Sequence, residues 1–428
     1  ITTNYAYFKF LPVVDPYRNR DDLDFASHTM YLLSTALEYS EGDEAFRLGS
    51  GLELAFSADF ARGVNGRTGI MELQPGQINW GSYNAQPLPG AVRMWVWHSY
   101  GLGDEFICTY RFRQPLFGGE MYHKGIMETD GITVSPGGNE YARTIEEFRN
   151  VAAMADKDTE LPEERKKCRT AFLWNFDNIF DQTNIPHNQD WDVWKHNYNY
   201  YAVLKSMGVE IDFITEEEEF DPEVYPYMVA PAYQLLDEKL IERWMNYVES
   251  GGNLVLSCRT AQKDRNGHLW ETLLQEPVYE LIGSSINFND QLPSGQTSII
   301  NYKNNNFKWN TWAEILEPEK NTKILAFYDQ HFYKGKAAAV NKIHEKGSVT
   351  YIGANSADRM LEREVLRDLY IEKGGEIMDL PWYVFVEWRD GLFVAVNYSS
   401  DEYNLNIDEE NIVIGKKVLK PGGVTVWK

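Results

Sequence analysis

The sequence has few cysteines. Cys108, Cys168 and Cys258 are the only ones in 428 residues, they lie far apart, and none belongs to a Cys-x-x-Cys pair. Such spacing argues against a disulfide framework and against a structural zinc site. We expect each cysteine to be a small buried apolar side chain. Cys258 ends the strand-like stretch NLVLSC but lacks the turn glycines of a nucleophile elbow, so thiol catalysis in the middle of the chain is the least favoured interpretation.

The sequence also lacks long apolar runs and an excess of positive charge. No run approaches the roughly 18 apolar residues that a membrane-spanning helix requires. The formal net charge of -23 repels phosphate backbones and anionic lipid surfaces, so neither nucleic acid nor a membrane is an expected partner. No signal-like segment precedes the strand-like opening at Ile1. We expect a soluble protein, and the compartment stays open between cytoplasm and periplasm.

What the sequence has in excess is aromatic residues. Aromatic side chains make up 14% of the chain, including 13 Trp and 26 Tyr. These residues pack cores, and their flat apolar faces also stack on sugar rings. A chain of 428 residues is long enough for two or three domains.

The first part of the chain alternates strand-like and helix-like segments. Apolar stretches typical of strands are ITTNYAYF (1–8), LDFASH (23–28), GIMEL (69–73) and EFICTYRFRQ (105–114). Helical periodicity lies between them, and PGAVRMWVWHSYGLG (89–103) is one such helix. Alternation of this kind predicts parallel β/α units, and four units are half of a (β/α)8 TIM barrel. We assign residues 1–158 to this partial barrel.

Two further regions follow. In residues 159–375, strand-like stretches such as NLVLSC and GSVTYIGANS alternate with helices, which favours a doubly wound, flavodoxin-like α/β domain. No phosphate-binding glycine motif is present in it. Residues 376–428 change to period-two alternation with a turn at Arg389-Asp390-Gly391, which predicts a small antiparallel β domain.

Polar side chains gather where the third and fourth predicted strands end. Glu72 closes the strand GIMEL, and Trp80 lies in the loop that follows. TYRFRQ ends the next strand with Tyr110, and the glycine-flanked loop GGEMYHKG offers Glu120 and His123. In β/α barrels the chemistry lies at these carboxyl ends of the strands. Carboxylates and an imidazole that bind hydroxyls, together with an indole platform, are what a sugar site requires.

These residues resemble a known family. The stretch from MELQPGQINW to GGEMYHKGI resembles the C-terminal half of the catalytic barrel of glycoside hydrolase family 42, the β-galactosidases. The close match covers about residues 69 to 127. The order of barrel, flavodoxin-like trimerisation domain and small β domain fits the same family over the whole chain.

The resemblance implies a retaining mechanism and a role for each matching residue. Glu72 matches the family's catalytic nucleophile, which forms a covalent glycosyl-enzyme. Trp80 matches the tryptophan lining the galactose subsite, Tyr110 an aromatic position near the ring, and Glu120 and His123 the pair that holds sugar hydroxyls. No metal and no cofactor are implied. Thr29, in SHTMYL, stands where the family has Asp, which affects the expected subsite contacts but not the nucleophile.

The general acid/base has no match in this sequence. The resemblance places it in an Asn-Glu pair ending the fourth barrel strand, whereas the predicted strands here correspond to strands five to eight. Asn139-Glu140 is such a pair but lies beyond the last strand, where we expect the final barrel helix to begin. We therefore expect the acid/base in a missing N-terminal half, for which a separate N-terminal piece is one candidate partner. We also expect a homotrimer that acts on galactosides. The alternative is a non-catalytic carbohydrate-binding or assembly remnant.

Overall fold

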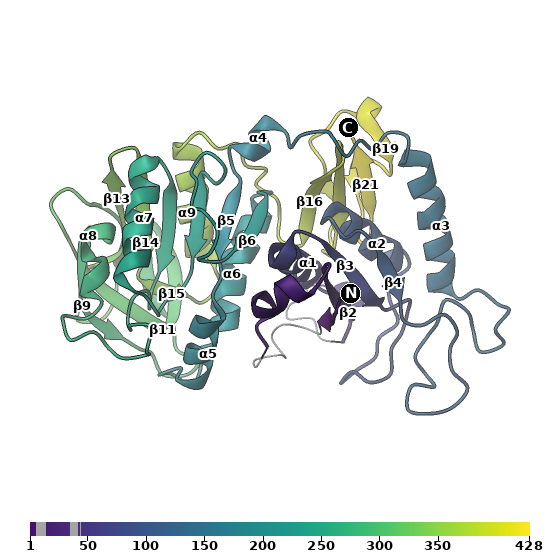
Figure 1. Cartoon of the computed structure of the whole chain (residues 1–428), viewed down its shortest axis with the longest axis horizontal. Helices are drawn as coiled ribbons and strands as arrows, with labels where there is room; N and C mark the ends of the chain where they lie inside the picture. Colours follow the sequence, from purple (N-terminus) through teal and green to yellow (C-terminus); the bar gives the residue numbers. More distant parts are fainter. Residues whose placement is uncertain (6–13, 35–41, 43) are drawn as a thin grey trace. The chain divides into compact units, whose positions relative to one another are not determined.

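A computed structural model describes residues 1–5, 14–34, 42 and 44–428 of the chain. The chain folds into two compact units (Figure 1). The first unit contains residues 1–162 and 378–428, and the second contains residues 163–377. In the described part of the chain, no helix combines the length and the apolar character that crossing a membrane requires.

A parallel four-stranded sheet organises the first unit. Its strands lie in chain order: β1 (Asn4–Tyr5), β2 (Ala26–Met30), β3 (Thr68–Leu73) and β4 (Ile107–Thr109). All three pairings between neighbours are parallel, as the alternation of strands and helices predicts. Residues 6–8 of the first predicted strand lie outside the described residues. β2 begins three residues later than predicted, because the polar start of LDFASH precedes its buried part.

Helices connect and follow these strands: α1 (Gly51–Asn65), α2 (Ala91–Gly101) and α3 (Pro136–Val151), with 3-10 helices at Pro16–Asp22 and Ala45–Arg47. The side chain of Ser50 caps α1 by accepting a hydrogen bond from the Glu53 amide at 3.2 Å. α1 ends at Gly66, whose φ of 82° lies in the left-handed region that glycine adopts easily. α1 and α2 are buried along most of their length, as expected of helices that cover a sheet.

The C-terminal segment forms antiparallel sheets within the first unit, made of β16 (Val384–Arg389), β17 (Leu392–Asn397), β18 (Tyr403–Asn404), β19 (Ile412–Ile414), β20 (Val418–Leu419) and β21 (Val424–Trp427). β16 and β17 form the predicted hairpin, and both turn residues, Asp390 and Gly391, have positive φ. The segment packs on α2, where Nδ1 of His98 lies 3.0 Å from the Tyr398 hydroxyl.

The second unit contains the flavodoxin-like arrangement predicted from the sequence. Its parallel strands are β5 (Thr170–Leu173), β6 (Ile211–Ile214), β7 (Tyr227–Ala230), β8 (Asn253–Ser257) and β14 (Gly347–Ile352). They lie in the order β6-β5-β7-β8-β14, which is the 2-1-3-4-5 order of flavodoxin-like sheets. GSVTYIGANS does return the last parallel strand, since β14 pairs with β8.

Helices cover both faces of this parallel sheet, so its strands are buried on two sides. Successive side chains along β5 point to opposite faces of the sheet. Ala171 and Leu173 join the core beneath α7, while Phe172 and Trp174 pack against aromatic rings that include Tyr201 of α6. The helices of the unit are α4 (Glu163–Lys166), α5 (Phe176–Asn184), α6 (Val193–Ser206), α7 (Glu238–Ser250), α8 (Tyr279–Ile282) and α9 (Met360–Glu372), with a 3-10 turn at Glu276–Val278.

The sheet continues into an antiparallel part that sequence patterns did not reveal. Its strands are β9 (Ser284–Asp290), β10 (Ser298–Tyr302), β11 (Asn305–Pro318), β12 (Lys323–Tyr328), β13 (Ala337–His344) and β15 (Ala354–Ser356). Register shifts interrupt the pairings of β11 with β9 and β15, and of β12 with β13. Such irregularities break the period-two alternation that identifies a strand in a sequence.

One expectation about the cysteines is wrong. Cys108 is exposed, because it lies on β4, the last strand in the described order of the first sheet. Cys168 and Cys258 are buried, as predicted. Burial raises the pKa of the Cys258 thiol well above its ordinary value, which disfavours the thiolate that a nucleophile requires.

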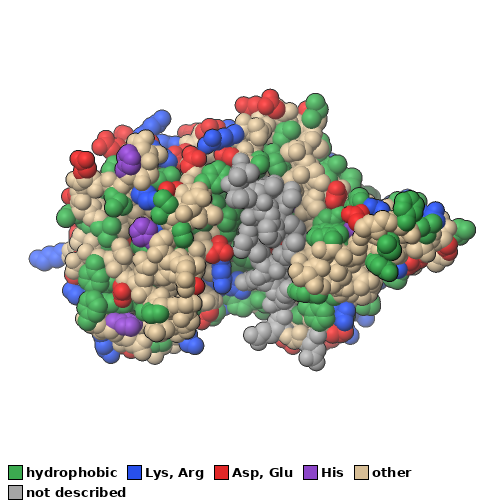
Figure 2. All heavy atoms as spheres, turned by 90° about the horizontal axis from the view of Figure 1, so that it is seen from below, with side chains coloured by type: hydrophobic (Ala, Val, Ile, Leu, Met, Phe, Trp, Pro, Cys, Tyr) green, Lys and Arg blue, Asp and Glu red, His purple; other side chains and the backbone are tan. Residues whose placement is uncertain are grey.

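Acidic side chains are spread among hydrophobic and basic ones on the face that Figure 2 shows. They form no continuous acidic field on that face, although the formal net charge of the chain is -23.

Candidate active site

Glu72 lies near the carboxyl end of β3, where two neighbouring strands contribute its hydrogen-bond partners. The hydroxyl of Tyr31, directly after β2, donates to Oε2 of Glu72 at 2.7 Å. Nδ2 of Asn4, on β1, donates to Oε1 at 3.4 Å. Thr29 contributes indirectly, because its hydroxyl donates to Oδ1 of Asn4 at 2.7 Å. Residues from three adjacent strands therefore orient one carboxylate.

Tyr31 is suited to a donor role. Its side chain is buried, and burial, followed by the hydrogen bond to Glu72, raises the pKa of its hydroxyl far above the ordinary value. The phenol therefore stays protonated at any physiological pH and keeps donating to the carboxylate.

Aromatic rings join Glu72 to the other predicted site residues. The Tyr31 ring meets Trp80 edge-on, with centroids 4.8 Å apart, and meets the His123 ring at 5.8 Å. His123 in turn lies 5.4 Å from the ring of Tyr110. Trp80 stays 46% exposed, so part of its indole faces solvent, as a platform for a ligand must.

Glu120 is held by the residues that end the fourth strand. The Tyr110 hydroxyl donates to Oε2 of Glu120 at 2.9 Å. The guanidinium of Arg111 donates to the same carboxylate oxygen and to the Tyr110 hydroxyl, and lies over the Tyr110 ring. Because these donors converge on Oε2, Oε1 of Glu120 is the oxygen left to accept a hydrogen bond from a ligand.

His123 is fully buried, and neither ring nitrogen has a well-formed hydrogen bond to a described residue, although the Tyr110 backbone lies near the ring. Burial lowers the pKa of the imidazole, while the nearby Glu120 carboxylate opposes that decrease. A neutral imidazole has one nitrogen that donates and one that accepts. Neither function is held in a well-formed bond within the fold, so a hydroxyl group that reaches the ring has a donor and an acceptor to meet.

The loops that carry these residues are tied together. The Gln74 side chain, fully buried, accepts from the Leu33 amide and donates to the Gly76 carbonyl. The amide of Lys124 donates to the Gln77 carbonyl at 2.8 Å, which joins the loop after β3 to the loop after β4. These bonds explain how two loops of irregular structure hold a fixed geometry.

The structure thus brings together all five residues singled out in the sequence: Glu72, Trp80, Tyr110, Glu120 and His123. Sequence reasoning missed three residues of the same cluster, Asn4, Tyr31 and Arg111. The sequence could have indicated Tyr31, since it directly follows a strand at the edge of the sheet where Glu72 lies. Among the described residues, no cluster of three or more His, Cys, Asp or Glu side chains is placed to hold a metal ion.

The pair Asn139-Glu140 lies in the first half of α3, the helix after β4, as expected. Both carboxylate oxygens of Glu140 accept backbone amides at the start of α2, from Gly90 at 2.8 Å and from Arg93 at 2.9 Å. A carboxylate at a helix N-terminus stabilises that helix. Glu140 is therefore engaged in capping α2.

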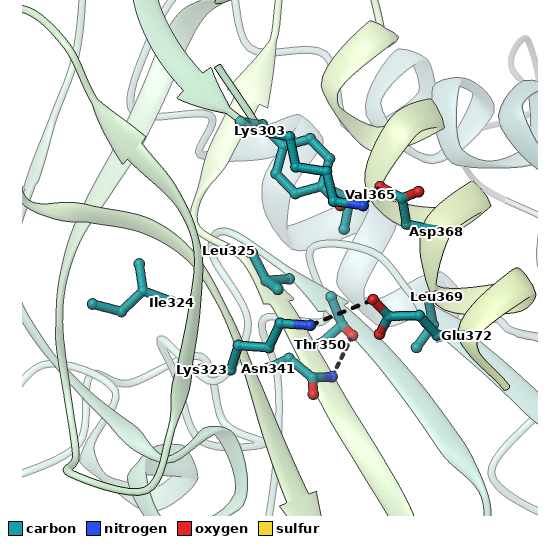
Figure 3. A pocket seen from close by; sticks show the side chains of 11 residues that line it. Lys303, Lys323, Ile324, Leu325, Asn341, Thr350, Val365, Asp368, Leu369 and Glu372 are labelled. Carbon is teal, nitrogen blue, oxygen red and sulfur yellow. Dashed lines mark hydrogen bonds and ion pairs between the residues drawn. The ribbon is translucent and has the colours of Figure 1, made fainter. Parts of the chain in front are cut away.

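At least two pockets lie away from this cluster. One, in the second unit, has a volume of about 150 Å³ between α9 and strands β12 to β14 (Figure 3). Lys323 and Glu372 face each other across it at 3.4 Å, so its charged groups already have partners. The other, in the first unit, has a volume of about 540 Å³ and is bordered by β4, α2 and α3. Its lining includes the apolar side chains of Val96, Phe106 and Phe148.

Family models match part of the first unit and nearly all of the second. Residues 1–151 match the β-galactosidase model of glycoside hydrolase family 42, and residues 168–376 match the model described as the β-galactosidase trimerisation domain. The chain belongs to glycoside hydrolase family 42.

Members of family 42 match over nearly the whole chain. The β-galactosidase BgaH of Haloferax lucentense is 29% identical over 412 residues, which cover 95% of this chain and 60% of that protein. A β-galactosidase of Thermus thermophilus is 26% identical, covering 99% of this chain and 62% of that protein. The solved structure of the β-galactosidase from Halorubrum lacusprofundi superimposes with a TM-score of 0.90 and 26% identity, covering 100% of this chain and 63% of that chain. This family 42 chain spans about three fifths of the length of such relatives.

Proposed function

We propose that this chain is the nucleophile-bearing part of a retaining β-galactosidase, an enzyme that hydrolyses terminal non-reducing β-D-galactosides. The observation that carries the proposal is the orientation of Glu72 by Tyr31 and Asn4 at the same strand ends that hold Trp80, Glu120 and His123. Relatives over the whole chain carry the name β-galactosidase, which supports galactosides as the substrate class.

The finer architecture belongs to this proposal. β1 to β4 correspond to strands five to eight of a TIM barrel, residues 1–158 to the half barrel, 159–375 to the trimerisation-type domain and 376–428 to the small β domain. The apolar pocket beside β4 supports this interpretation, because a further β/α unit paired with β4 would cover it. The relatives extend over a length that could supply such units.

The proposed reaction begins when Glu72 attacks the anomeric carbon of the galactoside. The bond to the leaving oxygen breaks, and a glycosyl ester of Glu72 forms. Trp80 provides an apolar platform, and Oε1 of Glu120 and the imidazole of His123 bind sugar hydroxyls. A second carboxylate protonates the leaving oxygen and later activates water. We assign that carboxylate to a segment that this sequence does not include.

Trapping of the glycosyl ester tests the role of Glu72. The full chain is incubated with 2,4-dinitrophenyl β-galactoside, whose leaving group departs without acid assistance, and its intact mass is measured. We expect a mass increase of one hexosyl unit, because no base speeds hydrolysis of the ester. Glu72→Gln should show no increase, whereas the matched control Glu140→Gln, whose carboxylate caps α2, should still be labelled.

The other outcomes are equally informative. Labelling of Glu72→Gln would contradict the nucleophile assignment. If the chain gains no mass but binds galactose in calorimetry, the alternative of a non-catalytic carbohydrate-binding or assembly remnant is favoured.

We also propose that the protein is a homo-oligomer, as a chain with a trimerisation-type domain suggests.

A further inference from the structure

The turn at residues 117–122, which carries Glu120, has little packing of its own. Phe117 and Tyr122, at its two ends, are 84% and 70% exposed. Nothing lies within 4 Å of a Cβ placed on Gly118 or Gly119. A turn with so few apolar contacts depends on hydrogen bonds to keep its position. The place of the Glu120 carboxylate in the site therefore depends on what the backbone of this turn binds.

Two side-chain amides hold this turn on either side of Glu120. Nδ2 of Asn79, in the loop after β3, donates to the Gly119 carbonyl at 2.5 Å. Nε2 of Gln114, after β4, donates to the Met121 carbonyl at 2.9 Å. Gly119 and Met121 are the neighbours of Glu120 in the chain, so the two bonds fix the backbone from which its carboxylate extends. We call Asn79 and Gln114 the amide clamp.

The amide clamp acts through its nitrogen atoms. A carbonyl oxygen only accepts hydrogen bonds, so the nitrogen of each amide must face the turn. Oδ1 of Asn79 and Oε1 of Gln114 are buried and have no hydrogen-bond partner among the described residues. Gln114 is only 8% exposed, so little water competes for its donor group. A hydrogen bond shielded from water in this way is stronger than an exposed one.

We propose that Asn79 and Gln114 are positioning residues for substrate binding, which hold Glu120 where its Oε1 meets a sugar hydroxyl. The inference rests on the proposed function, in which Glu120 binds galactoside hydroxyls, and adds two residues that act through Glu120. Asn79 also directly precedes Trp80, so its bond joins the backbone of the indole platform to the backbone of Glu120. A sugar thus meets a platform and a hydroxyl-binding carboxylate whose separation this bond limits.

Labelling kinetics with 2,4-dinitrophenyl β-galactoside test the amide clamp. The rate of hexosyl mass increase of the full chain is measured over a range of galactoside concentrations. Gln114→Met and Asn79→Leu keep the shape of each side chain but lose its amide, so each should raise the half-saturating concentration by about fivefold or more. The limiting rate should change by less than about twofold, because Glu120 binds the sugar both before and during the reaction.

The matched control is Asn65→Leu. Nδ2 of Asn65 donates to the Leu23 carbonyl at 3.1 Å, beside the start of β2 and away from the carboxyl ends of the strands. This variant also loses an amide that binds a backbone carbonyl, and it should keep wild-type labelling kinetics. Circular dichroism checks that each variant is folded.

A double substitution separates positioning from general destabilisation. Glu120→Ala removes the group that the amide clamp positions. Adding Gln114→Met to Glu120→Ala should therefore raise the half-saturating concentration by less than about twofold further, whereas effects that are independent would multiply.

The possible failures are distinguishable. Unchanged half-saturating concentrations, an effect on the limiting rate alone, or full additivity with Glu120→Ala overturns the amide clamp and leaves the proposed function intact. If the wild type binds galactose without gaining mass, the same fivefold weakening is expected in the calorimetric Kd of the variants, and its absence overturns the amide clamp. A wild type that neither gains mass nor binds galactose overturns the proposed function and, with it, this inference.

Discussion

The hydroxyl of Tyr31 donates the shorter of the two hydrogen bonds described for the Glu72 carboxylate, at 2.7 Å. A hydrogen bond to a charged group orients it and also withdraws electron density from it. The bond strengthens or weakens as the carboxylate charge changes during ester formation. At the residue scale, the reactivity of Glu72 therefore depends on a side chain from the neighbouring strand.

Tyr31→Phe tests this dependence. Removing the hydroxyl leaves the ring and its edge contacts with Trp80 and His123 in place. Because the hydroxyl fixes the attacking carboxylate in place, its loss misplaces Glu72 by more than the regained electron density offsets, and we expect glycosyl-ester formation to slow by roughly tenfold to a hundredfold. The measurement is the rate of mass increase with 2,4-dinitrophenyl β-galactoside. Tyr122→Phe, 70% exposed in the loop that carries His123, is the control, and an equal effect there would contradict the assignment.

At the element scale, the loop after β3 depends on the helix that follows the fourth strand. The first turn of α3 approaches this loop so closely that a Cβ on Gly137 would lie 1.6 Å from the Pro75 carbonyl oxygen. Only glycine permits this contact, which supports the backbone directly after Gln74 and three residues beyond Glu72. A helix with no proposed catalytic residue therefore positions the loop that begins with the nucleophile.

Gly137→Ala is expected to separate α3 from this loop. The clash is with backbone, which cannot move aside cheaply, so we expect a loss of about 1–3 kcal/mol in stability. Thermal unfolding measures the change. Gly119→Ala is the control, because nothing lies within 4 Å of a Cβ placed there. Equal thermal unfolding midpoints for the two variants would show that the close approach of α3 to the loop is not essential for stability.

At the scale of the whole molecule, the stability of the second unit should depend on pH through buried carboxyl groups. Glu362, on α9, is buried, and burial raises its pKa to about 7. Burial also raises the pKa of Glu314 to about 7. A carboxyl whose folded pKa exceeds its unfolded value stabilises the fold fully below the unfolded pKa. That stability is lost as pH rises through the folded pKa.

Glu362→Gln isolates the contribution of one such carboxyl. Buried His196, whose pKa is lowered to about 4, changes stability in the opposite sense between pH 4 and 6.5, but it does so equally in the wild type and the variant. Relative to the wild type, the variant should gain about 3 kcal/mol of stability between pH 4.5 and pH 8. Urea denaturation at both values measures the gain. Glu364→Gln, half-exposed on the same helix, is the control. A gain that does not change with pH would contradict the prediction.

The sequence alone was sufficient for the elements with regular periodicity. The parallel strands of both units, the helices α2, α6 and α7, and the hairpin at Asp390-Gly391 follow from local patterns of apolar and turn residues. Five site residues could also be identified from the sequence, because they all lie in one continuous motif: Glu72, Trp80, Tyr110, Glu120 and His123. Their roles, and the division of the chain at 158 and 375, remain predictions.

The tertiary structure decided what depends on contacts distant in sequence. Tyr31 and Asn4 meet Glu72 across 41 and 68 residues, so no local pattern could pair them. The exposure of Cys108 depends on which strand lies at the edge of its sheet. The antiparallel strands from β9 to β13 are irregular and are held by pairing with one another, which a sequence window does not contain. Local sequence encodes periodicity and turn chemistry, whereas proximity and burial are properties of the folded chain.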